Sequence, residues 1–183
     1  MPDLHGLRVA VLATDDFEDS ELTEPVKALR EAGATADIIS PKTGTITGKK
    51  GTQVSVDREI TQVKPEEYGA VILPGGTGNA DKMRMNMDVQ AFIKGMNAKG
   101  APFGVICHAP WELISAGLAR GRTMTSYYTL QDDVKNAGAT WVDEEVVVDG
   151  NLVTSRNPGD IPAFNREVLK LFELAAQPAG SAR

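Results

Sequence analysis

The sequence has few of the residues that hold a fold together through covalent bonds or metals. Its 183 residues include one cysteine and two histidines. A single cysteine excludes an internal disulfide and is typical of a reducing compartment. One cysteine and two histidines are also too few for a zinc site built from Cys and His ligands. The sequence therefore predicts no structural metal, and we expect no cofactor.

Positive charge and long apolar stretches are also scarce. Lys and Arg number 19 against 25 Asp and Glu, which gives a net charge of -6. This balance argues against a nucleic-acid partner and against attraction to an anionic membrane surface. No apolar run approaches the roughly 18 residues of a spanning helix, and the start MPDLHGLR lacks a secretory leader. We expect a cytoplasmic globular protein.

Short aliphatic segments alternate with amphipathic ones along the chain. Four segments are predicted as buried strands, at residues 7–13, 35–40, 70–73 and 102–106. Apolar residues at helical spacing follow the strands. The first helix is expected to begin at Pro25 and to end at Gly33. Glycine-punctuated stretches at 43–57 and 145–154 indicate small β-hairpins.

This alternation predicts an α/β fold with a mostly parallel central sheet and helices on both faces. No repeat or linker interrupts it, so residues 1–183 are interpreted as one domain. Residues 177–183 are small and polar and are predicted to form a frayed tail.

Three loops that carry unusual residues follow three of the predicted parallel strands. They contain an acidic run at 14–19, a glycine-rich run at 74–79 and Cys107-His108. The carboxyl ends of parallel strands share one edge of the sheet, where ligands bind. The sequence therefore predicts that an acid, a glycine-rich backbone and a thiol meet in one cleft.

Cys107 stands where a strand passes directly into a helix, as in a nucleophile elbow. A helix N-terminus favours the thiolate form, and amides there and at Gly75-Gly76 could hold a developing oxyanion. His108 is a candidate base or proton shuttle. The alternative is that Cys107 is a small buried hydrophobe and His108 an ordinary polar residue at a helix start.

The acidic run admits two interpretations. Asp16, Asp19 and Glu21 suit the first turn of a helix for capping and dipole reasons. A carboxyl group facing the sulfur would have to be protonated to donate a hydrogen bond to it, and burial would raise its pKa in that direction. The pattern alone does not choose which acid faces the thiol.

Several motifs together resemble the PfpI family of intracellular proteases and general stress proteins, within the superfamily of the Parkinson's-linked protein deglycase. The resemblance covers about residues 7–174. The motifs are VILPGG at 71–76, VICHAP at 105–110, LISAG at 113–117, RGR at 120–122, DDVKNAG at 132–138 and EVVVDG at 145–150.

The resemblance implies a flavodoxin-like three-layer sandwich and a set of site residues. It implies Cys107 as nucleophile, His108 as its partner and Glu18 as the protonated acid beside the sulfur. The backbone amides of Gly76 and His108 would form the oxyanion hole. Asp81, supplied by the neighbouring subunit of a homodimer or larger homo-oligomer, would complete a Cys-His-acid triad. The loop before Asp81 is one residue longer than the family pattern, and Ala109 replaces the usual glycine.

The implied activity is that of a cysteine-dependent stress-protection enzyme that attacks carbonyl carbons. Peptidase, methylglyoxal-glyoxalase and protein-deglycase activities all begin with this step, and the partners would be small carbonyl compounds, peptides or glycated proteins. The alternative is a redox-sensing or chaperone-like stress protein in which Cys107 is oxidised without turnover.

A third hypothesis is nucleotide binding, because the stretch at 76–81 follows a strand and begins like a dinucleotide fingerprint. Asp81 stands where that fingerprint needs Gly or Ala, and its charge would oppose a pyrophosphate. A papain-type site is excluded because no histidine follows His108 in the sequence.

Overall fold

A seven-stranded sheet forms the centre of the protein in the computed structural model, which describes residues 1–176. The predicted tail at 177–183 lies outside the described residues. The sheet order is β10-β11-β7-β6-β1-β2-β5, and only β10 runs antiparallel to its neighbour. Its strands are β1 (Arg8–Leu12), β2 (Thr35–Ser40), β5 (Arg58–Glu59), β6 (Ala70–Leu73), β7 (Phe103–Ile106), β10 (Val147–Asp149) and β11 (Leu152–Ser155).

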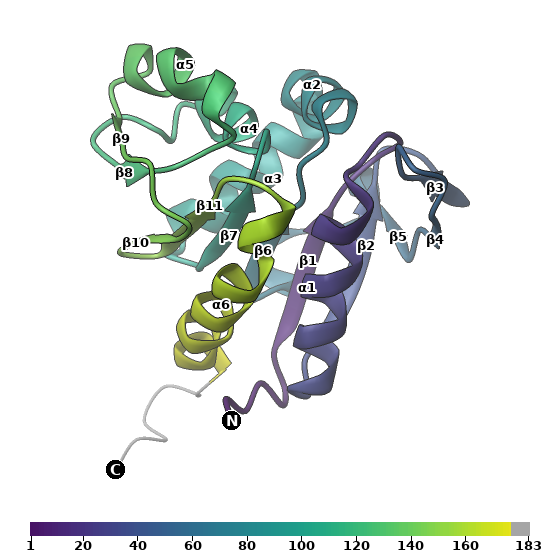
Figure 1. Ribbon diagram of the computed structural model, residues 1–183. Helices are drawn as coiled ribbons and strands as arrows, with labels where there is room; N and C mark the ends of the chain where they lie inside the picture. Colours follow the sequence, from purple (N-terminus) through teal and green to yellow (C-terminus); the bar gives the residue numbers. More distant parts are fainter. Residues whose placement is uncertain (177–183) are drawn as a thin grey trace.

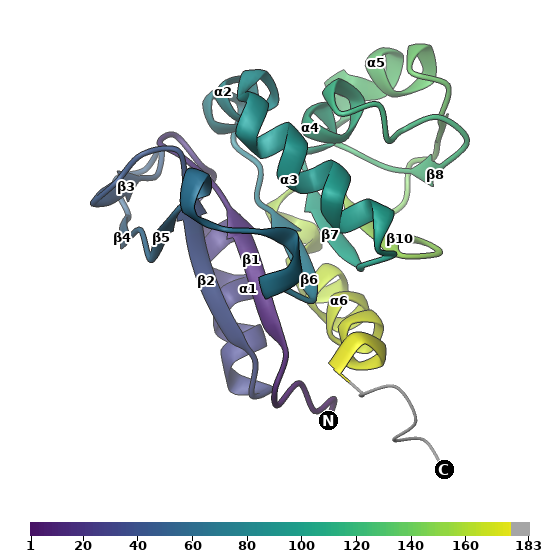
Figure 2. The ribbon, with the colours of Figure 1, turned by 180° about the vertical axis from the view of Figure 1, so that it is seen from behind.

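Helices cover both faces of this sheet (Figures 1 and 2). Helices α1 and α6 pack side by side on one face, and α3 crosses the other. The α-helices are α1 (Asp19–Glu31), α2 (Thr77–Met85), α3 (Met87–Ala98), α4 (Pro110–Ser115), α5 (Gln131–Asn136) and α6 (Ile161–Ala176). Short 3-10 helices span Ile60–Gln62, Pro65–Glu67, Tyr128–Leu130 and Pro158–Asp160. The predicted three-layer α/β sandwich is confirmed.

The alternation of side chains along the strands divides the core in two. In β1, Val9 and Val11 face the layer of α1 and α6, where they join a cluster with Leu22 and Phe164. Ala10 and Leu12 point to the opposite face and join the cluster around α3. Because both faces are buried, the strand reads as an unbroken aliphatic run, and this is why the sequence revealed it.

The five central parallel strands follow the doubly wound order 2-1-3-4-5 when they are counted along the chain. The strand order reverses between β1 and β6. The connections that follow these two neighbouring strands therefore run to opposite faces of the sheet. A crevice opens at such a switch point, beyond the carboxyl ends of the strands. Three loops meet there, after β1, β6 and β7.

The two predicted hairpins are present. Strands β3 (Thr45–Thr47) and β4 (Gln53–Ser55) pair antiparallel, as do β10 and β11. A further short parallel pair joins β8 (Thr123–Met124) to β9 (Thr140–Trp141). Among residues 1–176, no helix combines the length and the apolar character needed to cross a membrane.

Helix α1 begins earlier than the sequence predicts. It starts at Asp19, with Glu18 as its N-cap residue, and Pro25 lies inside it rather than at its first turn. Asp19 and Glu21 give the first turn the negative charge that a helix N-terminus favours. The buried stripe of Leu22, Val26 and Leu29 packs against the sheet and outweighs the one backbone hydrogen bond that proline removes.

Glu112 on α4 is a buried carboxyl that the fold tolerates at a cost. Its side chain is fully buried, neither oxygen has a hydrogen-bond partner among the described residues, and burial raises its pKa well above the usual value. The folded chain therefore holds Glu112 protonated, whereas the unfolded chain ionises it above about pH 4.3. Stability from this group is present below that pH and is lost as the pH rises.

Glu112→Leu is expected to raise the free energy of unfolding by about 1–3 kcal/mol at pH 7, because it removes an unsatisfied polar group from the core. The gain should be smaller at about pH 3, where glutamic acid is protonated in both states. Urea unfolding of the two proteins at both pH values measures this. A variant less stable than wild type at pH 7 would contradict this account of Glu112.

Candidate active site

Cys107 occupies a strained turn at the carboxyl end of β7. Its φ of 65° lies in the left-handed region, which is uncommon for a residue other than glycine. Two hydrogen bonds hold the turn: the Cys107 amide donates to the Ser155 carbonyl at 3.0 Å, and the Cys107 carbonyl accepts from the Tyr127 amide at 2.8 Å. The side chain is 6% exposed. Backbone outliers of this kind are concentrated at functional sites, so Cys107 is the leading candidate for a functional residue.

Polar groups from two loops converge on the sulfur. The Nδ1 atom of His108 lies 3.2 Å from the sulfur of Cys107. Burial raises the pKa of the Cys107 thiol, and the backbone amides of Gly76 and His108, which face the sulfur, oppose that rise. These are the two amides predicted for the oxyanion hole, and they surround the atom to which a substrate carbon would bond.

The acid against the sulfur is Glu21, whereas the family resemblance implied Glu18. Glu21 is completely buried, and its carboxyl group lies against Gly75 and close to the Cys107 thiol. Neither carboxyl oxygen has a hydrogen-bond partner within the usual distance and angle limits among the described residues. The correction follows from where α1 starts. Glu18 precedes the helix as its N-cap, and Glu21 lies in the first helical turn, which packs over the loop at Gly75.

Glu18 lies at the wall of the same cleft, with its carboxyl group turned toward two lysines. Its Oε1 atom is 3.6 Å from the Lys49 Nζ atom and 3.7 Å from the Lys50 Nζ atom. Both lysines belong to the turn between β3 and β4, and the Asp19 carboxylate holds that turn by accepting from the Lys50 and Thr52 amides at 2.9 Å.

Burial sets the protonation of the two groups at the centre. Desolvation, with the nearby charge of Glu18, raises the pKa of Glu21 to about 8, so this carboxyl is protonated at neutral pH. Desolvation also raises the pKa of the Cys107 thiol, and a charge on Glu21 would raise it further. The expected preference for thiolate at a helix N-terminus is thus opposed by burial, and the thiol needs a base to lose its proton.

His108 is placed to be that base. Desolvation and the charge of Lys49 lower its pKa, so the imidazole is neutral at neutral pH. Its Nε2 atom lies 3.2 Å from the Thr77 hydroxyl. The ring stacks on Tyr127 with centroids 4.7 Å apart and meets Trp111 edge-on at 5.3 Å. These contacts hold the Nδ1 atom toward the sulfur.

Glycine is required at position 75 because the loop after β6 lies against both reacting side chains. A Cβ atom there would collide with the Glu21 carboxyl group and come within 2.7 Å of the Cys107 Cβ atom. At Gly76, whose φ is 95°, a Cβ atom would collide with the backbone between Asp16 and Glu18. The Pro-Gly-Gly sequence thus allows the backbone to approach the thiol.

The groups described above border a cleft of about 420 Å³. The residues lining it are Glu18, Lys49, Gly76, Thr77, Cys107, His108, Tyr127, Thr129 and Pro158. The predicted meeting of an acid, a glycine-rich backbone and a thiol is present in it. Within residues 1–176, no group of three or more His, Cys, Asp or Glu side chains is arranged to hold a metal ion.

Asp81 is not part of the cleft in a single chain. It is exposed on α2, the helix that also carries Thr77, and it is not among the residues that line the cleft. Within this chain the partner of the His108 Nε2 atom is the Thr77 hydroxyl. A role for Asp81 in the triad would therefore need a second copy of the protein.

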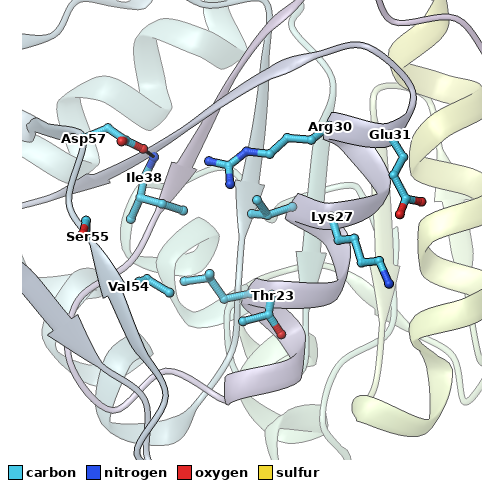
Figure 3. Close-up of a pocket in the computed structure, with 10 residues that line it drawn as sticks. Thr23, Lys27, Arg30, Glu31, Ile38, Val54, Ser55 and Asp57 are labelled. Atoms are coloured by element: carbon cyan, nitrogen blue, oxygen red, sulfur yellow. Dashed lines mark hydrogen bonds between the residues drawn. The ribbon is translucent and has the colours of Figure 1, made fainter.

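A second cavity, of about 550 Å³, lies between α1 and β4 (Figure 3). Leu22, Val26, Ile38 and Val54 provide its apolar lining, with Thr23, Lys27, Arg30, Glu31, Ser55 and Asp57 around them. None of these residues is a cysteine or histidine, and none has a strained backbone. The reactive groups lie in the Cys107 cleft instead.

Sequence reasoning did not identify three residues of the site: Glu21, Thr77 and Tyr127. Glu21 carries a usable signal, because it lies three residues after Glu18 and therefore on the same side of a helix. Thr77 opens a helix that was interpreted as a loop. Tyr127 lies in a segment that is distant from Cys107 in the sequence, and no local sequence pattern predicts its contact with the turn at Cys107.

Fold and site together define a class: a flavodoxin-like protein with a buried cysteine at a strand-to-helix elbow. The chain belongs to the DJ-1/PfpI family, whose model matches residues 7–171. It is 47% identical to "Deglycase TK1284" of Thermococcus kodakarensis over 91% of this chain and 99% of that protein. It is 42% identical to "Putative cysteine protease YraA" of Bacillus subtilis over 91% of this chain and 98% of that protein.

A solved structure with the same fold is a two-domain protein of Anabaena variabilis that contains DJ-1/ThiJ/PfpI-like and ferritin-like domains. The match has a TM-score of 0.87 and 35% identity, and it covers 90% of this chain and 47% of that one. Relatives in this family therefore carry the names of enzymes, both deglycase and cysteine protease.

Proposed function

We propose that the protein is a cysteine-dependent enzyme that acts on reactive carbonyl compounds and their adducts with proteins, as a glyoxalase or deglycase. The observation that carries the proposal is the elbow itself. Cys107 is held at a φ of 65° with the His108 Nδ1 atom 3.2 Å from its sulfur and two backbone amides facing it. This arrangement supports a nucleophile role for Cys107, a base role for His108 and an oxyanion-donor role for the two amides.

Attack would begin with the neutral thiol and the neutral imidazole. The sulfur bonds to the carbonyl carbon, the thiol proton passes to His108, and the carbonyl electron pair moves onto oxygen. The Gly76 and His108 amides would hold that oxyanion. Glu21, protonated at neutral pH because burial raises its pKa to about 8, adds no negative charge beside the sulfur and can donate a hydrogen bond to it.

With methylglyoxal, His108 returns the thiol proton to the oxyanion, and the product of this attack on the aldehyde is a hemithioacetal. Neutral His108 would then carry a proton from the former aldehyde carbon to the neighbouring ketone carbon while the hydroxyl proton passes to the former ketone oxygen, which leaves a thioester of lactate on Cys107. Water hydrolyses the thioester and restores the thiol. The aldehyde carbon is oxidised and the ketone carbon reduced within one molecule, so methylglyoxal and water give lactate without an external oxidant.

Two observations favour small carbonyl compounds over long peptides. The cleft of about 420 Å³ would hold a small substrate or the tip of a modified side chain. The Thermococcus relative, at 47% identity, is named a deglycase. The proposal includes a cytoplasmic location and a homodimer in which Asp81 of a second copy approaches His108.

Product analysis on the wild-type protein tests the proposal. The substrates are methylglyoxal, its adduct with N-acetylcysteine and an unmodified peptide, and lactate and peptide fragments are followed by NMR. We expect lactate from methylglyoxal or its adduct, well above the rate in buffer. Absence of lactate from both would overturn the proposal. Peptide cleavage without lactate would replace it with a peptidase function.

A further inference from the structure

Asn79 is a buried polar residue to which neither the sequence motifs nor the proposed reaction gives a role. It lies in the first turn of α2 and is completely buried. Its Nδ2 atom donates to the Pro74 carbonyl at 3.1 Å and to the Gly75 carbonyl at 3.0 Å. Its Oδ1 atom accepts from the Thr14 amide at 2.8 Å. The Asn79 side chain thereby joins the loop after β6 to the end of β1.

These partners leave the side-chain amide one orientation. Both carbonyl groups can only accept, and the Thr14 amide can only donate. A flipped Asn79 would set its oxygen against two carbonyl oxygens and its NH₂ group against an N–H. All three hydrogen bonds are therefore lost together if the side chain rotates or is removed.

The two carbonyl groups belong to the peptide units that face the reacting side chains. A peptide unit is planar, and its C=O and N–H bonds point in opposite directions. The Pro74 carbonyl shares a plane with the amide of Gly75, a residue that lies directly against the Glu21 carboxyl group. The Gly75 carbonyl shares a plane with the Gly76 amide, which faces the Cys107 sulfur.

We infer that Asn79 is a positioning residue: its single NH₂ group holds both peptide planes, and so aims the Gly75 amide at Glu21 and the Gly76 amide at Cys107. The inference rests on the proposed function for its catalytic consequence, but the geometry of the thiol can be tested without turnover. Glycine makes such support necessary, because residues 75 and 76 have no side chains of their own to restrict these planes.

One of the two carbonyl groups has a second hydrogen bond that does not depend on Asn79. The Gly75 carbonyl also accepts from the Glu18 amide at 3.2 Å, whereas the Pro74 carbonyl receives its side-chain hydrogen bond from Asn79. Loss of Asn79 should therefore free the plane that faces Glu21 more completely than the plane that faces Cys107. The first change removes an amide donor from the neutral Glu21 carboxyl group, and the second removes one from the sulfur, where negative charge develops during attack.

The test compares Asn79→Ala with Asn86→Ala. Asn86 caps the next helix by accepting from the Asp88 and Val89 amides, and it is not among the residues that line the cleft. Two quantities are measured for each: the rate of Cys107 alkylation by iodoacetamide as a function of pH, and kcat and KM for methylglyoxal. Thermal melting shows how much stability each variant has lost.

We expect Asn79→Ala to slow alkylation at neutral pH by about tenfold and to lower kcat about 10- to 100-fold, with KM within twofold. Asn86→Ala should melt at a lower temperature but keep both rates. If Asn79→Ala does not fold, Asn79→Ser, which is too short to reach both carbonyls, takes its place. Alkylation and kcat equal to wild type in a folded Asn79 variant would reduce Asn79 to a structural role. If wild type produces no lactate and Asn79→Ala is still alkylated more slowly, the positioning role of Asn79 is supported and only the proposed function is refuted.

Discussion

Cys107→Ser is expected to abolish turnover of methylglyoxal and of its adducts, with a loss of at least about 10⁴-fold. The serine hydroxyl is a far weaker acid than a thiol, and a neutral imidazole cannot deprotonate it effectively. The elbow should persist, because the backbone hydrogen bonds of residue 107 to Ser155 and Tyr127 do not involve the sulfur. Circular dichroism and melting temperature should therefore remain close to those of wild type.

The sequence offers a clean control for this experiment. Cys107 is the only cysteine among the 183 residues, so iodoacetamide modifies one sulfur and nothing is needed to protect others. Alkylated wild-type protein should match the serine variant, and methylglyoxal should slow the alkylation. Turnover by Cys107→Ser above a few per cent of the wild-type rate would exclude the sulfur as the nucleophile.

The elbow could be predicted from the sequence because its cause is local. A buried strand that passes directly into a helix must turn within two or three residues, and Cys107-His108-Ala109-Pro110 leaves no other place for the turn. The meeting of the three loops was predictable for a related reason. Parallel strands have a common direction, so their carboxyl ends meet at one edge whatever the details of packing.

The identity of the acid was not predictable in the same way. Glu18 and Glu21 differ by one helical turn, and the choice between them depends on where α1 begins. Pro25 suggested a late start, but the packing of Leu22 and Leu29 against the sheet keeps the helix regular through the proline. The roles of Tyr127 and Asn79 depend on contacts between distant segments, and only the folded chain brings those segments together.

Glu21→Gln is expected to change how activity depends on pH. In the wild-type protein, desolvation raises the pKa of Glu21 to about 8. Above that pH the carboxyl ionises, so it has no proton to donate to the sulfur, and it repels the negative charge that forms there during attack. The rate kcat/KM should therefore fall about tenfold per pH unit above 8. Glutamine stays neutral and can still donate, so the variant should lack this fall.

The same pKa shift predicts a change in stability with a defined sign. Glu21 has a higher pKa in the folded chain than its usual value of 4.5, so the folded state binds the proton more tightly. Its contribution is fully present below about pH 4.5 and is lost as the pH rises toward 8, by up to roughly 4–5 kcal/mol. Urea unfolding at pH 5 and at pH 8.5 should show a larger loss in wild type than in Glu21→Gln, because Glu112 contributes equally to both proteins and Glu21 only to wild type. Parallel pH dependence in the two proteins, in both rate and stability, would mean that the group titrating near pH 8 is not Glu21.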